Sequence, residues 1–514
     1  MKTSYLTKIP MRYKNLKIAL FAMATLSIAE SCKQKSTEDL LSDATRLKTK
    51  EMSAAAAAGN AGITLNWDQT YQRIDGFGAF GGRIVPFFES QKRDSILSYL
   101  WGENGLHLNM VRGKVLHTYG FNQQTGVVTI KPTGVDIDVD VNSNAYKTLT
   151  DVQKEHLGQL WILKKIKERY QVPITFASTW TPPLSMKTNP NSESGKWFNG
   201  LNFNTSSSAF ARYLAGFAKA YQNEGINFYA ISPSNEPENV FSDWDASYWN
   251  SAHLGEFITN NLRPALNQQG LNATKILSSE NAAWGTANTF LGGMDKSNVD
   301  ILAGHGYVEI GELIGGKRGL NQNPVTWNYA TGNKPVWMTE TSDDGGTYDN
   351  SITGGLKMAT SMHKFMAECN VNAFVYWLGM LAIRNNESLI CTNGDGSLDF
   401  PKTYDVMGQF SRYVRAGYFR FGANVQNNSE LKVSAYKDPA TGKFSLVVIN
   451  PGTQQLTTTL NLQGFSAGSL IGYQTTGNSA AHWQQGSPVS AAADGSFTLN
   501  IPAQSVTTFT GLKN

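Results

Sequence analysis

Charged residues, cysteines and long apolar runs are all scarce in this sequence. Charged residues occupy 16% of the 514 positions, below the roughly 25% of ordinary soluble domains, and the formal net charge is +4. Lysine and arginine are scattered along the chain, so the sequence lacks the basic surface of a nucleic-acid-binding protein. We therefore expect neutral or weakly charged partners and no nucleic acid.

The cysteines indicate neither a metal site nor a disulfide framework. The chain has three, Cys32, Cys369 and Cys391. Neither Cys369 nor Cys391 has a histidine at metal-ligand spacing, and no C-x-x-C or H-x-x-x-H motif occurs. A disulfide between these two is not favoured, and we expect two reduced structural cysteines. We expect no metal and no cofactor.

The N-terminal segment has the pattern of an export signal. Basic residues precede an apolar stretch from Ile18 to Ala29, which is too short to span a bilayer as a helix. The following Ala29-Glu30-Ser31-Cys32 is similar to a bacterial lipoprotein processing site, so two alternatives stay open: lipidation of Cys32, or ordinary cleavage nearby. Either way we predict a signal peptide over residues 1–31, a linker over 32–60, and a protein that is periplasmic, surface-anchored or secreted.

Between residue 71 and about residue 420, short β-rich apolar runs alternate with longer amphipathic stretches, which is typical of strand-helix units. Val152–Tyr170 and Ser208–Asn223 are predicted helices. Eight such units favour a closed (β/α)₈ barrel over residues 71–420, because closure removes exposed edge strands. The eight predicted strands are Ile74–Phe80, Leu108–Arg112, Ile174–Ser178, Phe228–Ser232, Lys275–Ser279, Ile301–His305, Val336–Thr339 and Ala373–Trp377.

The C-terminal part of the chain has a different period. After about residue 424, alternating apolar and polar residues replace the helical pattern, and Asp438–Lys443 has the composition of a hairpin turn. We predict a β-sandwich over residues 421–514, to which Ile63–Trp67 in the segment 61–70 could add a strand. Its predicted strands are Leu431–Tyr436, Phe444–Asn450, Gln455–Asn461, Ser496–Ile501 and Ser505–Thr510. The segment 113–144, after the second barrel strand, is predicted to be a long loop or hairpin.

Two glutamates follow predicted barrel strands, Glu236 in Ser234-Asn235-Glu236-Pro237 and Glu340 in Trp337-Met338-Thr339-Glu340. The interval between them leaves room for about three strand-helix units, so both would project from the same barrel face. A retaining glycosidase needs a protonated acid and a nucleophilic carboxylate about 5 to 5.5 Å apart. We interpret Glu236 as the acid/base and Glu340 as the nucleophile.

Further polar and aromatic residues stand at the ends of other predicted strands, where a barrel would bring them into one pocket: Arg112, Trp180, His305, Tyr307 and Trp377. Trp180 and Trp377 are the expected sugar platforms, because the C–H faces of sugar rings pack on aromatic planes. His305 is expected to line the pocket beside Tyr307.

One motif is typical of a different class of protein, the dinucleotide-binding enzymes. Gly76-x-Gly78-x-x-Gly81 fits the dinucleotide-binding fingerprint, but no acidic residue ends a strand about 20 residues further on. We interpret these glycines as allowing a sharp turn or a close approach to a sugar.

The ordered set of motifs resembles glycoside hydrolase family 30. The motifs are Gly76-Phe77-Gly78, Ser178-Thr179-Trp180-Thr181-Pro182-Pro183, Asn235-Glu236, His305-Gly306-Tyr307, Thr339-Glu340, Trp377, Gly408 to Arg415, and Pro502 to Phe509. The resemblance implies a retaining mechanism with Glu236 and Glu340 in the roles given above. It also implies that Asn235 binds the sugar 2-hydroxyl, that Arg112 and Tyr307 hold Glu340, and that both ends of the chain build a side β-domain.

The resemblance leaves the substrate open. Members act on glucuronoxylan, on β-1,6-glucans and galactans, and on glucosylceramide, and the glucuronoxylan-specific group clasps the uronate with paired arginines and a Tyr-Gly after the eighth strand. Here Leu378–Glu387 contains Arg384 alone, which is the candidate contact to an acidic substituent.

The motifs are most similar to those of the xylanase members, so we predict a monomeric endo-hydrolase of β-1,4-xylan or glucuronoxylan. The alternatives are a β-1,6-glucanase, a β-1,6-galactanase, a glucosylceramidase-like enzyme or, from another class, a non-catalytic surface glycan-binding lipoprotein.

Overall fold

A computed structural model describes residues 62–327, 332–343, 347–479 and 481–514. The predicted signal peptide (1–31), the candidate lipidation site Cys32 and the predicted linker (32–60) lie outside the described residues. Within the described ranges, no helix combines the length and the apolar character needed to cross a bilayer.

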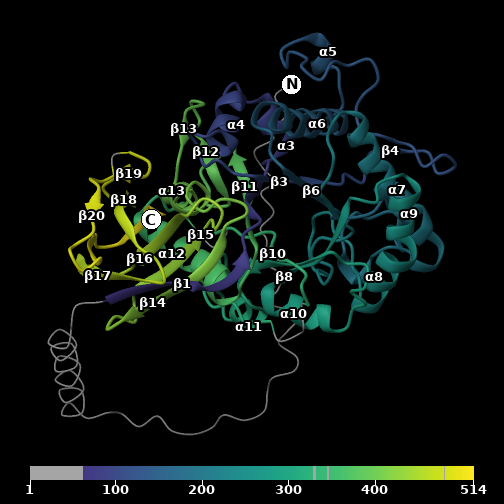
Figure 1. Cartoon of the computed structure of the whole chain (residues 1–514). Coiled ribbons are helices and arrows are strands. Elements are labelled where there is room, and N and C mark those ends of the chain that lie inside the picture. The colour runs from purple at the N-terminus through teal and green to yellow at the C-terminus, as the bar shows by residue number, and fades with distance from the viewer. Residues whose placement is uncertain (1–61, 328–331, 344–346, 480) are drawn as a thin grey trace, which may run out of the picture. The chain divides into compact units, whose positions relative to one another are not determined.

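Eight parallel strands form a closed barrel (Figure 1). Neighbouring strands pair in chain order, and β11 pairs with both β2 and β10, which closes the ring. The strands are β2 (Gly76–Phe80), β3 (Met110–Lys114), β6 (Ile174–Ser178), β7 (Ala230–Ser232), β8 (Lys275–Ala283), β9 (Ile301–Tyr307), β10 (Val336–Met338) and β11 (Ala373–Leu381). Each overlaps one predicted run, so the predicted (β/α)₈ barrel is confirmed. Two short strands, β12 (Ser388–Thr392) and β13 (Leu398–Asp399), extend the sheet beyond β11.

The barrel interior begins as an apolar layer. Its ten buried side chains are Met110, Ile174, Phe176, Ala230, Leu277, Ile301, Ala303, Trp337, Ala373 and Val375. Successive side chains of a strand alternate between its two faces, so the residue two positions further on points to the same side. On five strands that next residue is Arg112, Ser178, Ser232, His305 or Trp377. A polar layer therefore follows the apolar one toward the C-terminal ends of the strands.

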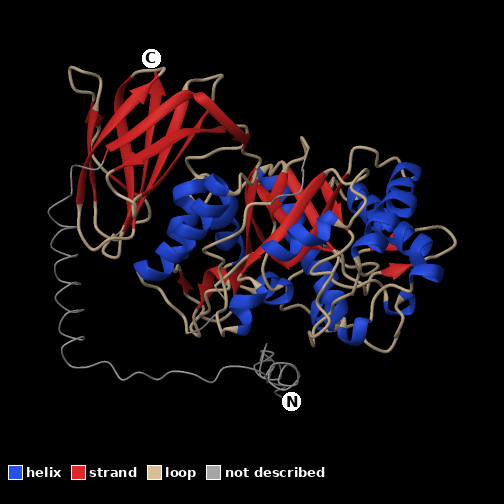
Figure 2. Cartoon of the chain, turned by 90° about the horizontal axis from the view of Figure 1, so that it is seen from below, coloured by secondary structure: helices blue, strands red, loops and turns tan. Residues whose placement is uncertain are grey.

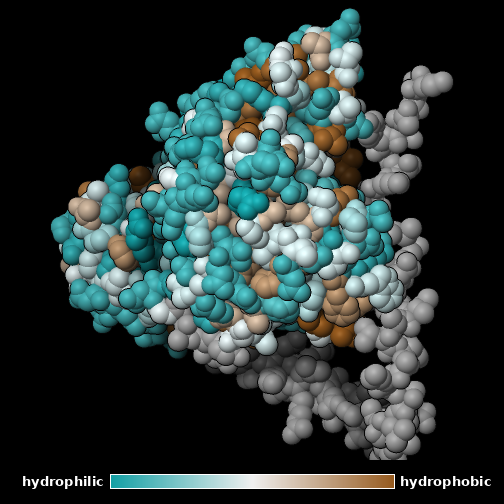
Figure 3. Space-filling view, turned by 90° about the vertical axis from the view of Figure 1, so that its right-hand side faces the viewer, coloured by the Kyte–Doolittle hydropathy of each residue, from teal (hydrophilic) through white to brown (hydrophobic). Residues whose placement is uncertain are grey.

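Helices cover the outside of the barrel (Figure 2). The predicted helices are confirmed as α6 and α7, and α6 begins with a capping box between Thr150 and Gln153. The side that carries α7, α8 and α9 is mostly hydrophilic or neutral, with hydrophobic residues in small groups (Figure 3). The α-helices are α3 (Ile84–Glu89), α4 (Arg93–Trp101), α5 (Asn144–Lys147), α6 (Asp151–Tyr170), α7 (Phe203–Asn223), α8 (Ser251–Phe257), α9 (Arg263–Gln268), α10 (Trp284–Gly292), α11 (Ile310–Ile314), α12 (Ile352–His363) and α13 (Lys402–Ser411). The 3-10 helices are η1 (Leu184–Met186) and η2 (Lys196–Phe198), and the π-helical segments are η3 (Ile258–Leu262) and η4 (Lys364–Glu368).

The segment after β3 contains the predicted hairpin in a reduced form. Two short antiparallel strands, β4 (Gly120–Phe121) and β5 (Val128–Thr129), pair in it. The alternating residues 135–140 form turns rather than a strand. Val128 and Ile130 are buried in the main core, which anchors this excursion to the barrel.

The remaining strands form a second, mostly antiparallel sheet with its own core (Figure 2). They are β1 (Gly62–Arg73), β14 (Phe419–Gln426), β15 (Lys432–Lys437), β16 (Lys443–Asn450), β17 (Leu456–Gln463), β18 (Ala467–Thr475), β19 (Gln484–Gln485), β20 (Val489–Ser490), β21 (Phe497–Ile501) and β22 (Ser505–Lys513). β1 pairs with β14 and with β17, so a strand from before the barrel joins the C-terminal sheet. Leu446 of β16 and Phe497 of β21 share one core although their strands lie far apart in the sheet order, as in a sandwich. The sequence-based prediction missed β14, β18 and the two-residue strands β19 and β20.

The side sheet is fixed to the barrel through α13. Gln409 donates a hydrogen bond to Thr475 and accepts one through its carbonyl from Thr508. A Cβ at Gly408 would lie 2.1 Å from the Trp483 ring, so only glycine allows the indole to pack this closely. This contact accounts for the motif that begins at Gly408.

The glycine motif and the cysteines also have structural explanations. A Cβ at Gly76 would lie 2.1 Å from Asn109 Oδ1, and one at Gly78 would lie 2.7 Å from Met110 Cβ. These glycines therefore allow β2 to pack closely against β3, which corrects the interpretation as a sharp turn or a sugar contact.

Cys369 and Cys391 are both free, as predicted.

Candidate active site

The two predicted catalytic glutamates follow strand ends on the C-terminal face of the barrel. Glu236 comes four residues after β7, and Glu340 comes two residues after β10. Glu236 has a φ of 49°, in the left-handed region, and its N–H donates to the Glu280 carbonyl at 2.9 Å. The turn that carries Glu236 is thus attached to β8, and a bulky residue adopts this backbone only when its surroundings hold it there.

The structure brings the two carboxylates together. Ligand atoms of Glu236, His305 and Glu340 all lie within 4.8 Å of one another, which places an oxygen of Glu236 within 4.8 Å of an oxygen of Glu340. The side chains of Glu236 and Glu340 are 12% and 5% exposed, so both carboxylates are nearly enclosed but reachable.

Arg112 connects most of the predicted residues. It is buried at the C-terminal end of β3 and donates through one nitrogen to Glu340 Oε2. Its other terminal nitrogen lies 2.6 Å from Asn235 Oδ1 and 3.2 Å from Glu280 Oε1. The Tyr307 hydroxyl donates to Glu340 Oε1 at 2.8 Å. Both oxygens of Glu340 therefore accept hydrogen bonds, which fix the orientation of the carboxylate.

Glu280 and His305 complete the buried charges. Burial opposes the charged form of Glu280, but Arg112 and then His305 outweigh it and lower the pKa of Glu280 to about 2. Burial also opposes charge on His305, whereas the carboxylates of Glu340, Glu236 and Glu280 raise the pKa of His305 to about 9. The imidazole lies 3.5 Å from Glu236 Oε1 and 3.9 Å from Glu280 Oε1. At neutral pH, His305 is therefore a second buried cation between the acids.

A further carboxyl lies beside Glu236. Glu238 accepts hydrogen bonds from Asn281 Nδ2 at 2.9 Å and from the Ala282 N–H at 2.8 Å. Burial and then the charge of Glu236 raise the pKa of Glu238 to about 7. Asn239 Nδ2 donates to Glu236 Oε2 at 3.0 Å. The turn after β7 thus holds two neighbouring carboxyls that do not both ionise readily.

Aromatic rings line one side of this group. Trp377 stacks on Phe80 with ring centroids 5.2 Å apart, and the Trp180 ring lies 5.8 Å from that of Trp377. Arg112 packs over Trp180, with its Cζ atom 4.7 Å from the ring centroid. Trp180 and Trp377 are only 5% and 9% exposed, so they form a wall of the site rather than broad open platforms.

Arg384 lies apart from the buried group. Its side chain is 59% exposed, and its Nε atom lies 2.9 Å from Asp399 Oδ2. The same nitrogen donates to Asn393 Oδ1 at 2.8 Å. The loop after β11 therefore uses this arginine for local contacts, whereas all the other predicted residues cluster around the carboxylates.

Sequence analysis missed Glu280 and Glu238. Glu280 lies in β8 beyond the predicted end of that strand at Ser279, where the pairing with β9 shifts register twice. It follows an apolar run just as Glu236 and Glu340 do, so the same strand-end criterion applied one residue further would have found it. Glu238 lies two residues after Glu236 and carried no separate pattern.

Glu236, His305 and Glu340 also have the side-chain chemistry of metal ligands. Both oxygens of Glu340 are already occupied by donors from Arg112 and Tyr307. A cation would have to displace a buried guanidinium, so the set fits a carboxylate pair better than a metal centre.

Comparison with known proteins agrees with this geometry. The family model for the glycosyl hydrolase family 30 TIM-barrel domain matches residues 76–366. Glucuronoxylanase XynC of Bacillus subtilis is 29% identical over 346 residues, 65% of this chain and 73% of that protein. The endo-1,6-beta-D-glucanase of Neurospora crassa is 27% identical over 251 residues, 45% of this chain and 49% of that protein.

A solved structure extends the likeness beyond the barrel. The subfamily 8 xylanase Xyn30A of Clostridium acetobutylicum superposes with a TM-score of 0.65 at 26% identity, covering 88% of this chain and 99% of that one. With the matched family model, the barrel and its enclosed carboxylates, these likenesses establish that the chain belongs to glycoside hydrolase family 30 and is a glycoside hydrolase.

Proposed function

We propose that this enzyme cleaves a β-linked polysaccharide by a retaining double displacement, with Glu340 as nucleophile and Glu236 as acid/base. The observation that carries the proposal is the approach of their carboxylate oxygens to within 4.8 Å. Retaining enzymes hold the two carboxyls about 5 to 5.5 Å apart, whereas inverting enzymes leave about 6.5 to 9.5 Å for a water molecule.

The contacts of each carboxylate support its role. Glu340 accepts hydrogen bonds from Arg112 and from the Tyr307 hydroxyl, so its carboxylate is held in one orientation for attack on the anomeric carbon. Glu236 protonates the leaving oxygen as the glycosyl-enzyme bond forms. In the second step, Glu236 takes a proton from water while that water displaces Glu340.

Two further groups are suited to hold the sugar. The Asn235 amide accepts from Arg112 through its oxygen, which directs its NH₂ group away from the guanidinium and toward a substrate hydroxyl. The buried indole nitrogen of Trp377 has no hydrogen-bond partner among the described residues. An unpaired buried N–H is unfavourable, so a sugar hydroxyl that accepts from it would gain binding energy.

For the substrate we favour β-1,4-xylan over β-1,6-glucan. The glucuronoxylanase from Bacillus subtilis has the higher identity, 29% over 65% of this chain, whereas the β-1,6-glucanases of Neurospora crassa and Trichoderma harzianum are 27% and 25% identical over 45% and 67% of it. Because Arg384 is engaged by Asp399 and Asn393, we propose that cleavage does not depend on a uronate side group.

The test is a panel of polysaccharides offered to the wild-type enzyme and to Glu340→Gln. The panel contains glucuronoxylan, unsubstituted xylan, β-1,6-glucan and β-1,6-galactan. We expect the wild type to release reducing sugar from the xylans. Glu340→Gln should lose turnover by a factor on the order of 10⁴ or more while it keeps its affinity for the polysaccharide. Glu430→Gln, an exposed change in the side sheet, is the matched control.

The anomeric form of the first product, followed by NMR, tests the stereochemistry. Retention supports the proposal, and inversion contradicts it. Binding without hydrolysis of any member of the panel would favour a non-catalytic glycan-binding protein instead.

A further inference from the structure

We propose that exposed aromatic residues on two loops of the catalytic face form a distal binding site for the polysaccharide chain that occupies the active site. The residues are Trp197 and Phe198 after β6 and Phe241 after β7. This inference rests on the proposed function and adds the location of a second contact with the same ligand.

The exposure of these side chains is unusual. Trp197 is 90% exposed, the highest value for a large apolar residue in the described part of the chain, and Phe241 and Phe198 are 66% and 62% exposed. Trp197 and Phe198 have φ angles of 56° and 63°, in a region that bulky residues disfavour. An exposed indole on such a backbone gains little from the protein core, and its face is accessible to a ligand.

The loop that carries these rings is held firmly. Lys187 is 3% exposed and donates to Thr181 Oγ1 and to the carbonyls of Glu193, Ser194 and Ala246, at distances from 2.8 to 3.0 Å. The two loops also meet through backbone pairing and through the ion pair between Lys196 and Asp243. A site built on these loops therefore needs little ordering when a ligand binds.

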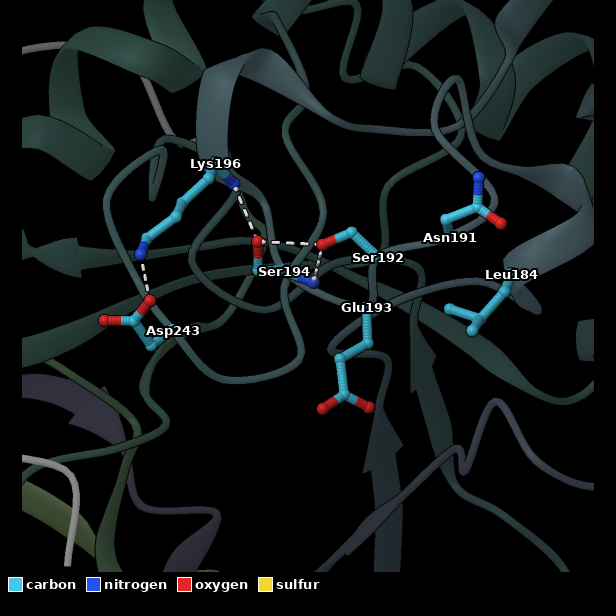
Figure 4. A pocket seen from close by; sticks show the side chains of 7 residues that line it. All are labelled: Leu184, Asn191, Ser192, Glu193, Ser194, Lys196 and Asp243. Carbon is cyan, nitrogen blue, oxygen red and sulfur yellow. Dashed lines mark hydrogen bonds and ion pairs between the residues drawn. The ribbon is translucent and has the colours of Figure 1, made fainter.

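A polar cavity of about 480 Å³ lies between these loops (Figure 4). Lys196 and Asp243 line it and contact each other, and each is close in sequence to one of the exposed aromatic segments. Asn191, Ser192 and Ser194 add uncharged donors and acceptors to the lining. This volume falls in the usual range for small-molecule sites, roughly 300 to 1,000 Å³.

A series of contacts links the active site to the lining of the cavity. Lys114 Nζ lies 5.1 Å from the centroid of the Trp180 ring and 2.6 Å from Asp245 Oδ2. Asp245 pairs through its backbone with Ser194, which lines the cavity. Leu184, on the other edge of the lining, comes four residues after Trp180. A polymer extending from the carboxylates past Trp180 would therefore reach the cavity and the loops beside it that carry Trp197 and Phe241.

The chemistry of the site favours a neutral glycan. Aromatic faces bind the C–H faces of sugar rings, and serine and asparagine bind hydroxyls. Lys196 and Asp243 pair with each other, and the other charge in the lining is the 55% exposed carboxylate of Glu193, so the site does not favour an anionic ligand. An apolar partner such as a lipid would leave the polar cavity unsatisfied.

The experiment compares Trp197→Ala with the wild type on a polymer and on a short substrate. The polymer is the member of the polysaccharide panel that the wild type cleaves fastest, and the short substrate is an aryl glycoside of the matching disaccharide. We expect KM for the polymer to rise about fivefold or more, because aromatic contacts contribute on that scale. The rate on the short substrate should not change. Leu512→Ala, which removes a 56% exposed side chain from β22, is the control and should change neither value.

Each outcome separates this inference from the proposed function. Hydrolysis with an unchanged polymer KM in Trp197→Ala overturns the distal site and leaves the function standing. If the wild type hydrolyses no member of the polysaccharide panel, the function fails, and the distal site is then judged by electrophoresis in gels that contain each polysaccharide. Retardation of the wild type that Trp197→Ala loses supports the site; equal retardation, or none, overturns it.

Discussion

The two layers of side chains inside the barrel differ in chemistry, although the same strands supply both. On β3 the apolar layer has Met110 and the polar layer has Arg112, and on β9 the corresponding residues are Ala303 and His305. The apolar layer contributes through burial alone, which does not depend on pH. The polar layer puts charges where desolvation opposes them, so its stability depends on each charge having its partner. In this barrel, the side chains that pack the core and the side chains that form the site therefore lie two residues apart on the same strands.

The largest expected effect comes from breaking the polar layer at its centre. Arg112→Met should leave Glu280 and Glu340 buried without their guanidinium, lower the free energy of unfolding by about 3 to 5 kcal/mol and reduce turnover at least about 100-fold. The loss of stability should be greater at pH 8 than at pH 5, because protonation neutralises unpaired carboxylates at the lower pH. Urea unfolding at both pH values and initial rates measure these effects.

Phe176→Ala is the matched change in the apolar layer. It should also cost about 3 to 5 kcal/mol, through a cavity, but by the same amount at both pH values. If Arg112→Met shows the same loss at pH 5 and pH 8, the distinction between the layers is wrong.

A smaller effect is expected from the histidine of the polar layer. The folded pKa of His305, about 9, lies above its usual value of 6.5, so its contribution to stability is complete below pH 6.5 and is lost as the pH rises through about 9. The free energy of unfolding should therefore fall over this range, and His305→Gln should flatten that part of the curve. Urea unfolding at intervals from pH 5.5 to 9.5 measures the slope.

His363 provides the control of opposite sign. Burial and then nearby lysines lower the pKa of His363 to about 3, so its effect on stability lies below pH 6.5. His363→Gln should leave the slope between pH 6.5 and 9 intact. An unchanged slope in His305→Gln would show that His305 is not the group that titrates there.

The smallest effect should come from the exposed arginine. Arg384→Ala removes an ion pair to Asp399 whose arginine is 59% exposed, so the free energy of unfolding should change by less than about 0.5 kcal/mol. Its kcat/KM on unsubstituted xylan should stay at the wild-type value, in contrast to Arg112→Met. A tenfold loss confined to glucuronoxylan would instead show that Arg384 leaves Asp399 to bind the uronate.

Much of the fold and part of the site could be predicted because they depend on local pattern. The eight barrel strands are apolar runs of ordinary length, and a chain that alternates them with amphipathic helices has few ways to bury both. Glu236 and Glu340 were found because each follows such a run. β14 and β18 were missed because both have partly exposed, weakly alternating sequences. They become strands through pairing with β1 and β22.

The sequence by itself determined the barrel, the side sheet and the strand ends at which Glu236 and Glu340 stand, since hydrophobic periodicity and short motifs are properties of neighbouring residues. Only the tertiary structure decided that Glu280 lies between Arg112 and His305, that Glu238 adjoins Glu236, and that Arg384 pairs with Asp399. Those relations depend on a register shift in β8 and on charges from distant parts of the chain. Electrostatic interactions act through space between residues that are far apart in sequence, so the individual charge pairs could not be predicted from the order of residues along the chain.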